Sequence, residues 1–388
     1  MVATPYRILL VSSTRADLGY LRFVIKALQK NPNFKIIVTA TCMHLAASSG
    51  KTIREFEELG IEVDEKVEML LDSDSPAGIA KSMGMGILGF ADLLDRVRPQ
   101  AVMVMGDRFE ILSVAAACLP FAIPVIHFSG GDLTEGVIDD AIRHAVTKLS
   151  HFHFPATEVH AKRLQQMGEE SWRIRAVGEP ALEFLSQETL LTKKELEKDL
   201  GFALEDSTLL VTFHPETLEA GDSKRQVAIL TQTLSKLSLP TIITGPNVDT
   251  GSSVIRETLK NFAKQNPKTL YVENLGHKRY LSLLQFVGAL LGNSSSGIVE
   301  APSFSLPVVN LGTRQNGRIK GVNIIDTPIE TERIMSAVEK ALSGDFKKTL
   351  VGMQNPYGDG NTSARVEEAL LEWIPRSAEA LHKKFTEK

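Results

Sequence analysis

The chain alternates short runs of β-branched and apolar residues with amphipathic helical stretches, and it does so in two successive series. In the first half, strand-like runs are separated by helical patterns such as Leu21–Lys30, Leu88–Val97 and Ile138–Leu149. This alternation is typical of βαβ units, which build a parallel sheet with helices on both faces. The predicted strands of this half are Arg7–Ser12, Lys35–Thr41, Ala101–Met105, Pro124–Phe128 and Phe152–Pro155.

The same alternation restarts after a Glu- and Lys-rich connection at Gln187–Asp199. With 388 residues, the chain is too long for one core of ordinary size. We therefore predict an α/β protein with two Rossmann-like domains, residues 1–185 and 186–364, and a C-terminal helix within 365–388 that packs back on the first domain. The predicted strands of the second half are Thr208–Phe213, Thr241–Thr244, Thr269–Val272, Ala289–Leu291 and Pro307–Leu311.

Composition excludes several classes of protein. The net charge is −4 with 23% charged residues, which does not favour nucleic-acid binding or a polybasic membrane surface. The two cysteines, Cys42 and Cys118, argue against a disulfide scaffold or a cysteine-ligated zinc site and fit a reducing compartment. The N-terminus shows no signal-peptide pattern, and no apolar run approaches transmembrane length. We expect a soluble cytoplasmic protein.

The segment Gly292–Glu300 places small hydroxyl residues directly after an apolar run and before a helical pattern. Backbone N–H groups at a helix start, together with the helix dipole, favour phosphate there. The hydroxyls of Ser294 and Ser295 add donors, and Glu300 lies where a carboxylate could accept hydrogen bonds from ribose. Taken alone, the segment is equally compatible with an ordinary Ser-rich helix cap.

Other polar residues of the second half also follow predicted strands. His214, Asn247 and Arg314 fall after such strands, at the sheet edge where open parallel sheets bind ligands. Imidazole, amide and guanidinium groups suit a nucleotide diphosphate. The chain has no Gly-x-Gly-x-x-Gly and no Walker A pattern, so hydride cofactors and ATP are poorly supported.

The strand ends of the first half carry acids and cations. Arg15 follows the first strand, Asp107 and Arg108 follow the Ala101 strand, and Asp132 follows the Pro124 strand. A single Asp at a strand end more often caps a helix than acts in catalysis. Two such acids accompanied by an arginine favour catalytic chemistry.

One helical pattern carries two charged pairs. Asp139 and Arg143 are i,i+4 neighbours, as are Asp140 and His144. By itself this spacing favours two surface ion pairs.

Six motifs occur in order along the chain: Thr14-Arg15-Ala16-Asp17, Gly106-Asp107-Arg108-Phe109-Glu110, His127-x-x-Gly130-Gly131-Asp132, Asp139-Asp140-x-x-Arg143-His144, Gly292-Asn293-Ser294-Ser295 and Asn310-Leu311-Gly312-Thr313-Arg314-Gln315. This ordered set resembles the hydrolysing UDP-N-acetylglucosamine 2-epimerases of sialic acid biosynthesis, from about residue 7 to about residue 365. The resemblance implies a glycosyltransferase-B fold with the active site in the interdomain cleft, and a homodimer or homotetramer. It also implies conversion of UDP-N-acetylglucosamine and water to N-acetylmannosamine and UDP, through elimination to a glycal and hydration, without metal or other cofactor.

The resemblance also implies roles for individual residues. Asp107 and Asp139 match catalytic acids of the first domain, and His214 would stabilise the departing diphosphate. Family members often carry Glu at the position of Ser129, so Asp132 becomes the nearest candidate for that proton-transfer role. The residues that match UDP-binding positions are Arg15, Arg108, His214, Asn247, Ser294, Ser295, Glu300 and Arg314.

Several alternatives remain open at this point. The departure at Ser129 is compatible with a modified sugar such as the 2,4-diacetamido-trideoxyhexose of legionaminic acid pathways. A glycosyltransferase of the same fold would use the same UDP site, and a non-hydrolysing 2-epimerase would return a UDP-sugar. A non-catalytic nucleotide-sugar sensor would not need Asp107 and Asp139.

Overall fold

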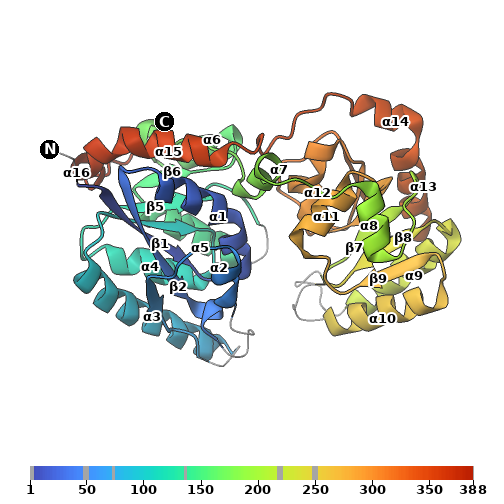
Figure 1. Ribbon diagram of the computed structural model, residues 1–388, viewed down its shortest axis with the longest axis horizontal. Helices are drawn as coiled ribbons and strands as arrows, with labels where there is room; N and C mark the ends of the chain where they lie inside the picture. The colour runs from blue at the N-terminus through green and yellow to red at the C-terminus, as the bar shows by residue number, and fades with distance from the viewer. Residues whose placement is uncertain are drawn as a thin grey trace. The chain divides into compact units, whose positions relative to one another are not determined.

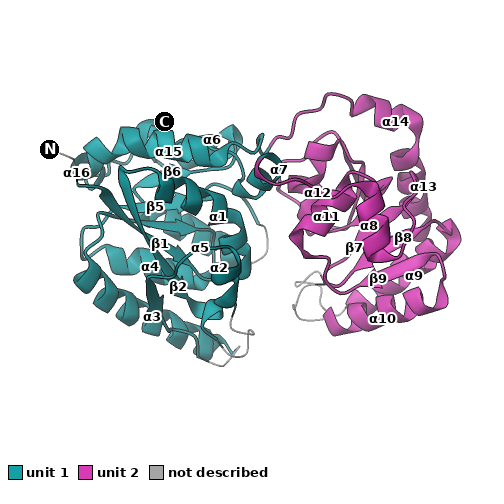
Figure 2. Ribbon diagram, in the orientation of Figure 1, with its two compact units in different colours: residues 1–186, 357–388 teal, residues 187–356 magenta. Residues whose placement is uncertain are grey.

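The computed structural model describes residues 4–46, 52–71, 75–134, 138–215, 222–246 and 252–387. It forms two compact units (Figure 1, Figure 2): residues 1–186 with 357–388, and residues 187–356. The chain returns to unit 1 at Tyr357, earlier than the predicted residue 365, because the whole of α15 (Thr362–Trp373) belongs to unit 1 and packs against α1 (Arg15–Lys30).

Unit 1 contains a parallel six-stranded sheet in the order β3-β2-β1-β4-β5-β6. In the register of β1, Ile8 lies opposite Ile36 on one side and Ala101 on the other. Strand β3 was not predicted, since Glu65-Lys66-Val67 is short and mostly polar. The strands are β1 (Tyr6–Ser12), β2 (Phe34–Thr41), β3 (Glu65–Val67), β4 (Ala101–Met105), β5 (Val125–Phe128) and β6 (Phe152–Phe154).

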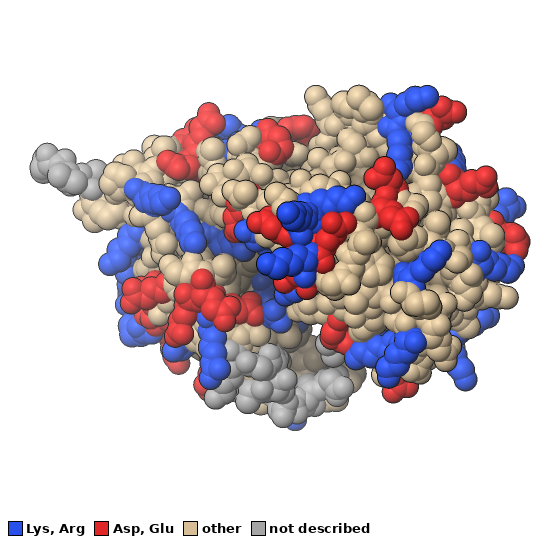
Figure 3. All heavy atoms as spheres, turned by 45° about the vertical axis from the view of Figure 1, so that its right-hand side comes forward, with Lys and Arg blue, Asp and Glu red and all other residues tan. Residues whose placement is uncertain are grey.

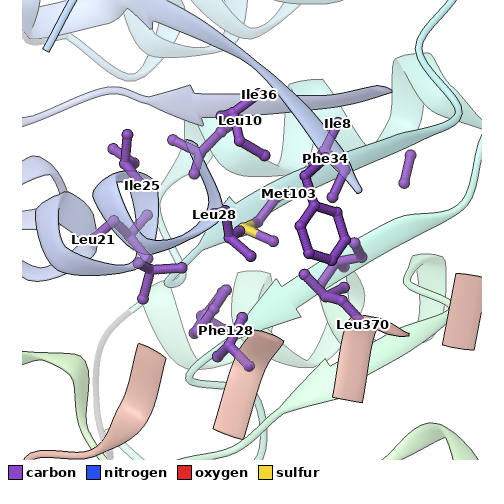
Figure 4. Close-up of a cluster of buried hydrophobic side chains, with 14 of the residues drawn as sticks. Ile8, Leu10, Leu21, Ile25, Leu28, Phe34, Ile36, Met103, Phe128 and Leu370 are labelled. Atoms are coloured by element: carbon purple, nitrogen blue, oxygen red, sulfur yellow. The ribbon is translucent and has the colours of Figure 1, made fainter. Parts of the chain in front are cut away.

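Helices cover both faces of this sheet. Successive β1 residues point to opposite faces: Ile8 and Leu10 pack with α1 and α15 in the cluster of Figure 4, whereas Leu9 and Val11 belong to the cluster formed with α3, α4 and α5. The remaining helices are α2 (Arg54–Glu58), α3 (Pro76–Val97), α4 (Phe109–Cys118), α5 (Ile138–Leu149), α6 (Glu158–Gln166), α7 (Phe184–Gln187) and α16 (Ser377–Ala380), with 3-10 turns at Cys42–His44, Ser171–Arg173, Pro180–Glu183 and Ile374–Arg376.

The last helices are integral to the core of unit 1. The indole of Trp373 stacks on the rings of Phe152 and Phe154, with centroid separations of 4.6 and 4.9 Å. After α16, the Lys383 ammonium donates to the carbonyl of Ser150 (2.7 Å) and pairs with the buried carboxylate of Glu169 (2.7 Å). The C-terminal segment therefore holds the end of α5 and the start of β6.

One expectation about membranes needs correction. Within the described ranges, α3 alone is long and apolar enough, by length and composition, to cross a bilayer. The sequence did not reveal that α3 is long and apolar, because its Gly and Ala residues interrupt the run of large apolar side chains. A core helix meets the same criterion, and α3 contributes Phe90, Leu93 and Leu94 to the core of unit 1.

Unit 2 repeats the topology of unit 1, with the parallel order β12-β11-β10-β7-β8-β9. Strand β12 was not predicted because it is a short edge strand with Asp326 within it. The strands are β7 (Leu209–Thr212), β8 (Thr241–Thr244), β9 (Thr269–Val272), β10 (Ala289–Gly292), β11 (Val308–Leu311) and β12 (Ile324–Thr327). The helices are α8 (Lys193–Leu200), α9 (Ser223–Leu237), α10 (Ser252–Gln265), α11 (Gly276–Leu284), α12 (Ser296–Val299), α13 (Thr331–Leu342) and α14 (Gly344–Thr349), with a 3-10 turn at Ala301–Phe304.

Surface charge follows the composition. On the face shown in Figure 3, acidic and basic side chains are interspersed over both units. Among the described residues, several acidic and basic side chains form exposed ion pairs, such as Arg365 with Asp359 and Arg376 with Glu379. This face therefore presents no broad field of one sign.

Candidate functional site

The turn after β1 is fixed by its own acid. Thr14 caps α1, and the Asp17 carboxylate accepts hydrogen bonds from the backbone N–H and the hydroxyl of Ser13, at 2.9 and 2.7 Å. These hydrogen bonds give Asp17 a structural role, which is to stabilise the turn before α1. The exposed Arg15 projects from the first helical turn and pairs with Glu55 at 2.6 Å. Glu55 has no role predicted from the sequence, because its partner lies on a separate helix.

Arg143 connects the turn after β4 to the first turns of α5. Its buried guanidinium pairs with Asp107 and with Asp140 (3.2 Å), and donates to the hydroxyl of Thr134 (2.8 Å). The expected partner on the helix was Asp139. The structure instead pairs Arg143 with Asp140, three residues earlier on the helix, and with Asp107 in the turn after β4. Asp140 also contacts His144 (3.4 Å), as predicted.

Asp139 lies beside this ion-paired group and is half-buried. Burial raises its pKa, and the negative charge of Asp107 raises it further. The structure thus combines a carboxylate held by Arg143 with a neighbouring carboxyl group that retains its proton more readily. Carboxyl groups with environments that differ in this way are typical of acid–base catalysis.

His127 of β5 contacts the turn after β4 that carries Asp107. Its Nε2 lies 2.8 Å from the carbonyl oxygen of Gly106, and burial lowers its pKa to about 3. The ring is therefore neutral near pH 7, and Nε2 carries the hydrogen that it donates to Gly106. This contact fixes the backbone immediately before Asp107.

The segment after β5 turns sharply before Asp132. Ser129 adopts φ +63° and Gly131 adopts φ +82°. A side chain at Gly131 would lie 2.6 Å from the carbonyl oxygen of His160. The Asp132 carboxylate accepts a hydrogen bond from the backbone N–H of Leu133 (2.8 Å) and lies 3.3 Å from Nε2 of His160. Asp132 is thus oriented by a histidine that sequence analysis did not identify.

Arg108 lies at the start of α4. Its Nε donates to the buried carboxylate of Glu110 at 2.5 Å. The other Glu110 oxygen is buried without a partner in the described structure. Glu110 therefore fixes the position of the Arg108 guanidinium beside the turn that carries Asp107. Glu110 belongs to a motif identified in the sequence, but no role was predicted for it.

In unit 2, the strand ends are joined by Asn293. Its side-chain oxygen accepts from the backbone N–H of His214 (2.8 Å), and its amide donates to the backbone carbonyl of His214 (2.9 Å). The backbone carbonyl of Asn293 accepts hydrogen bonds from the Arg314 guanidinium (3.1 Å) and from the Gln315 side-chain amide (2.8 Å). Through its side chain and its backbone carbonyl, the buried Asn293 therefore joins the segments that follow β7, β10 and β11.

The imidazole of His214 is buried. Burial lowers its pKa to about 3, with a smaller contribution from the positive charge of Arg314. His214 is therefore neutral at physiological pH in this structure. It can donate one hydrogen bond to a phosphate oxygen, but it adds no charge before a ligand binds.

The last residue of β10, before the serine loop, must be glycine. Gly292 has φ +146°, and a side chain there would lie 1.9 Å from the carbonyl oxygen of Thr212. Ser295 then precedes α12, so the helical pattern predicted after the serines is confirmed, but α12 is only four residues long and is followed by the 3-10 turn at Ala301–Phe304. Ser294 keeps a local contact, since its hydroxyl accepts from the N–H of Ser296 (3.3 Å).

Three buried polar atoms near this loop lack a hydrogen bond of normal geometry in the described structure, although the Tyr280 hydroxyl and the Glu300 carboxyl group both interact with the Ser296 hydroxyl. They are the hydroxyl oxygens of Ser296 and Tyr280 and one carboxylate oxygen of Glu300. Burial raises the pKa of Tyr280 to about 12 and also raises the pKa of Glu300. Buried polar groups are normally satisfied, so these atoms are suited to a polar ligand. Tyr280 was not identified from the sequence.

Asn247, which the sequence analysis placed at this edge, lies outside the described residues. The structure brings His214 and Arg314 together with Ser294 through Asn293. It brings Asp107 together with Arg143, beside Asp139 and Arg108, in unit 1. Within the described ranges, no group of three or more His, Cys, Asp or Glu side chains is arranged to hold a metal ion.

The two units share one strand order, and each places polar side chains at the carboxyl edge of a parallel sheet. This is the architecture of the glycosyltransferase-B class of nucleotide-sugar enzymes. The family model described as UDP-N-acetylglucosamine 2-epimerase matches residues 26–371. The chain belongs to this family.

Individual relatives agree with this assignment. The chain is 38% identical over 344 residues to the GDP/UDP-N,N'-diacetylbacillosamine 2-epimerase (hydrolyzing) of Campylobacter jejuni, covering 88% of this chain and 89% of the relative. It is 35% identical over 377 residues to the UDP-N,N'-diacetylbacillosamine 2-epimerase (hydrolyzing) of Legionella pneumophila, covering 97% and 98%. The crystal structure of the Neisseria meningitidis UDP-GlcNAc 2-epimerase bound to UDP-GlcNAc has the same fold, with a TM-score of 0.81, 21% identity, and coverage of 94% and 100%.

Proposed function

We propose that this protein is a hydrolysing 2-epimerase that converts a UDP-activated 2-acetamido sugar and water to UDP and the free 2-epimer. The observation that carries the proposal is the acid cluster of unit 1, in which Asp139 has a raised pKa beside Asp107, itself paired with the buried Arg143. The residues joined by Asn293 in unit 2 supply the complementary group of donors for a diphosphate.

The chemistry explains why both groups are needed. The C2 proton of the sugar is not adjacent to a carbonyl, so direct removal has a prohibitive barrier. Breaking the C1–O bond to UDP creates positive character at C1, and the C2 proton can then pass to a carboxylate, which yields a glycal and UDP. Water next adds its hydroxyl to C1 and a proton reaches C2 from the opposite face. Each positioned proton transfer typically contributes ~10²–10⁴-fold.

Named residues serve these steps. We assign Asp107 and Asp139 to proton transfer at the sugar, with Asp132, oriented by His160, as the candidate that replaces the family's glutamate. We assign His214, Arg314 and the serines after β10 to the diphosphate, where donors aimed at developing charge lower the barrier.

We assign Arg15 and Arg108 to UDP as well, and Glu300 to its ribose. In the structure Arg15 is paired with Glu55 and Arg108 with Glu110. Binding of UDP by Arg15 therefore requires exchange of an exposed ion pair, which costs little because such pairs are worth about 0–1 kcal/mol.

For the sugar, we favour UDP-N,N'-diacetylbacillosamine, a 2,4-diacetamido-trideoxyhexose, because the relatives from Campylobacter jejuni and Legionella pneumophila carry that substrate in their names. Ser129 in place of the family's common Glu supports a modified sugar. UDP-N-acetylglucosamine, the first expectation from the sequence, is the second candidate.

The test is incubation of the enzyme with each UDP-sugar in D₂O, followed by NMR of the products. We expect free UDP and a free 2-epimer with deuterium at C2, and faster turnover of the diacetamido substrate. A UDP-linked epimer as the stable product would refute hydrolysis. Product without deuterium at C2 would exclude elimination, and transfer of the sugar to an acceptor would favour a glycosyltransferase.

Variants separate the two groups of residues. Asp107→Asn should lower turnover by ~10²–10⁴-fold and leave UDP affinity nearly unchanged in calorimetry. Asp95→Asn, an exposed acid paired with Arg98 on α3, is the matched control and should alter neither. Loss of UDP binding in a folded Asp107→Asn protein would contradict the catalytic assignment.

A further inference from the structure

The hydroxyl group of Tyr280 is buried, although the residue as a whole is partly exposed. Tyr280 lies on α11, and its hydroxyl oxygen is directed into unit 2 rather than into solvent. A buried tyrosine hydroxyl normally forms a hydrogen bond, yet this oxygen lacks one of normal geometry among the described residues. None of the catalytic or UDP-binding roles proposed for this chain falls on Tyr280, so its hydroxyl is an unused polar group beside the serine loop.

Three other hydroxyl groups surround this oxygen. The Tyr280 hydroxyl interacts with those of Thr212, Ser294 and Ser296. Thr212 ends β7, and the two serines follow β10, which pairs with β7. The Thr212 hydroxyl is shared with that of Thr244 at 2.8 Å, and the Ser294 hydroxyl accepts from the N–H of Ser296 at 3.3 Å. The Ser296 hydroxyl has no hydrogen bond of normal geometry among the described residues, so it is the neighbour most available to Tyr280.

Ser296 also reaches the acid that is assigned to ribose. One helical turn joins Ser296 to Glu300, since the N–H of Glu300 donates to the carbonyl of Ser296 at 3.0 Å. The Glu300 carboxyl group interacts with the Ser296 hydroxyl. A hydroxyl has one hydrogen to donate, and an ionised carboxylate can only accept. When Ser296 donates to Glu300, its oxygen is left to accept from Tyr280, and the three groups form a chain directed from Tyr280 through Ser296 to Glu300.

This chain affects the form in which Glu300 meets a ligand. Burial raises the pKa of Glu300, whereas the hydrogen bond from Ser296 lowers it. A carboxyl group that keeps its proton accepts fewer hydrogen bonds than a carboxylate does, so it suits the two hydroxyls of a ribose less well. A hydroxyl that itself accepts a hydrogen bond is a stronger donor. Tyr280 therefore strengthens the Ser296 donor that stabilises and orients the Glu300 carboxylate.

We propose that Tyr280 is a positioning residue of the nucleotide site, whose hydroxyl acts through Ser296 to hold the Glu300 carboxylate in the orientation that accepts hydrogen bonds from ribose. The inference rests on the proposed function, in which Glu300 binds the ribose of UDP. The Tyr280 hydroxyl is buried, so it affects the ribose only through Ser296 and Glu300. Its aromatic ring is not needed for this effect, and Tyr280→Phe should keep the packing of α11 while losing the influence on ribose.

The preference for ribose hydroxyls measures this role. Calorimetry compares UDP with 2′,3′-dideoxy-UDP, which has the same base and diphosphate but offers Glu300 no hydroxyl. We expect wild-type protein to bind UDP at least about tenfold more tightly, since hydrogen bonds to a carboxylate are lost with the hydroxyls. Tyr280→Phe should lower this preference by about threefold or more and leave the affinity for the dideoxy nucleotide nearly unchanged. General damage to the site would instead weaken the binding of both nucleotides alike.

Two further variants test the route through Ser296. Ser296→Ala removes the intermediate hydroxyl and should lower the preference by about the same factor, which keeps the proposal testable if Tyr280→Phe does not fold. In the double variant Tyr280→Phe/Glu300→Gln, the preference should equal that of Glu300→Gln alone, because a residue that acts through another is not additive with it. A further loss of preference in the double variant would refute the route through Glu300.

Tyr6→Phe is the matched control. The buried Tyr6 lies at the start of β1 in unit 1, and its hydroxyl lies 2.8 Å from Oγ of Ser377. Tyr6→Phe should lower stability in urea denaturation and leave both nucleotide affinities unchanged.

The outcomes distinguish this inference from the proposed function. An unchanged preference in folded Tyr280→Phe and Ser296→Ala, or an equal loss of affinity for both nucleotides, overturns the inference alone. Equal affinity of wild-type protein for the two nucleotides would refute the assignment of Glu300 to ribose and this inference with it. Wild-type protein that binds no UDP would refute the proposed function as well.

Discussion

Replacement of Asn293 by alanine should damage both the stability of unit 2 and its affinity for UDP. The Asn293 side chain is fully buried and satisfies both backbone groups of His214. Alanine would leave that N–H and that carbonyl buried without partners. At about 1–3 kcal/mol for each unsatisfied group, the expected loss in free energy of unfolding is about 2–6 kcal/mol.

The same change should weaken UDP binding. Without the amide, the segment after β7 is no longer tied to the loop after β10, so His214 and Ser294 lose their fixed separation. We expect at least about a tenfold rise in the dissociation constant, which corresponds to loss of one well-placed hydrogen bond to a charged group. Asn293→Asp should be intermediate in stability, because a carboxylate can accept from the His214 N–H but cannot donate to the His214 carbonyl.

Urea denaturation and UDP calorimetry measure the two effects. Asn323 provides the control, since it is buried in the same unit and donates to the carbonyl of Leu306 (2.8 Å). Asn323→Ala should lower stability while leaving the UDP affinity of the folded protein unchanged. The reasoning fails if Asn293→Ala binds UDP normally, or if Asn323→Ala weakens UDP binding as strongly as Asn293→Ala does.

Two further predictions concern ionisation. Asp139 has a raised pKa, so its charged form is disfavoured in the folded state. Asp139→Asn should therefore stabilise the protein at pH 7 while lowering turnover. In melting experiments at different pH values, this gain in stability should vanish as the pH falls to the ordinary Asp pKa of 3.8. Glu169 has its pKa lowered to about 2, with hydrogen bonding and charge from His153, Lys383 and Lys148 outweighing burial. Its stabilisation should be complete above pH 4.5 and lost between 4.5 and 2. Glu169→Gln removes the buried negative charge that faces Lys383 and Lys148 and should cost about 3–5 kcal/mol at pH 7 in urea denaturation.

The sequence was sufficient for the architecture because the central parallel strands are strongly apolar and recur between amphipathic helices. The two-sheet α/β fold and the family predicted from the motifs are both confirmed. The strands that escaped detection, β3 and β12, are the edge strands on one side of each sheet. Edge strands are short and partly polar, so Glu65–Val67 carries neither the length nor the alternation that identifies a strand.

The candidate site was less predictable, because its contacts join residues distant in sequence. Strand ends could be located, and with them Asp107 and His214. Neither contact follows from local spacing, since each joins a helix to a turn after a strand: Arg143 of α5 contacts Asp107 after β4, and His160 of α6 contacts Asp132 after β5. Tyr280 gave no signal at all, as a tyrosine within an amphipathic helix is ordinary. The functional roles of the site residues stay predictions until the variants are measured.

The return of the chain to unit 1 at Tyr357 has a consequence for synthesis on the ribosome. Trp373 covers Phe152 and Phe154, yet it is translated only after all of residues 187–356. At about 5–20 residues per second, this delay is on the order of ten seconds or more. The nascent first sheet must therefore wait with its β6 aromatic face uncovered while unit 2 emerges and folds. Chaperone binding to ribosome-bound chains should accordingly peak during this interval and fall once the last helix has left the exit tunnel.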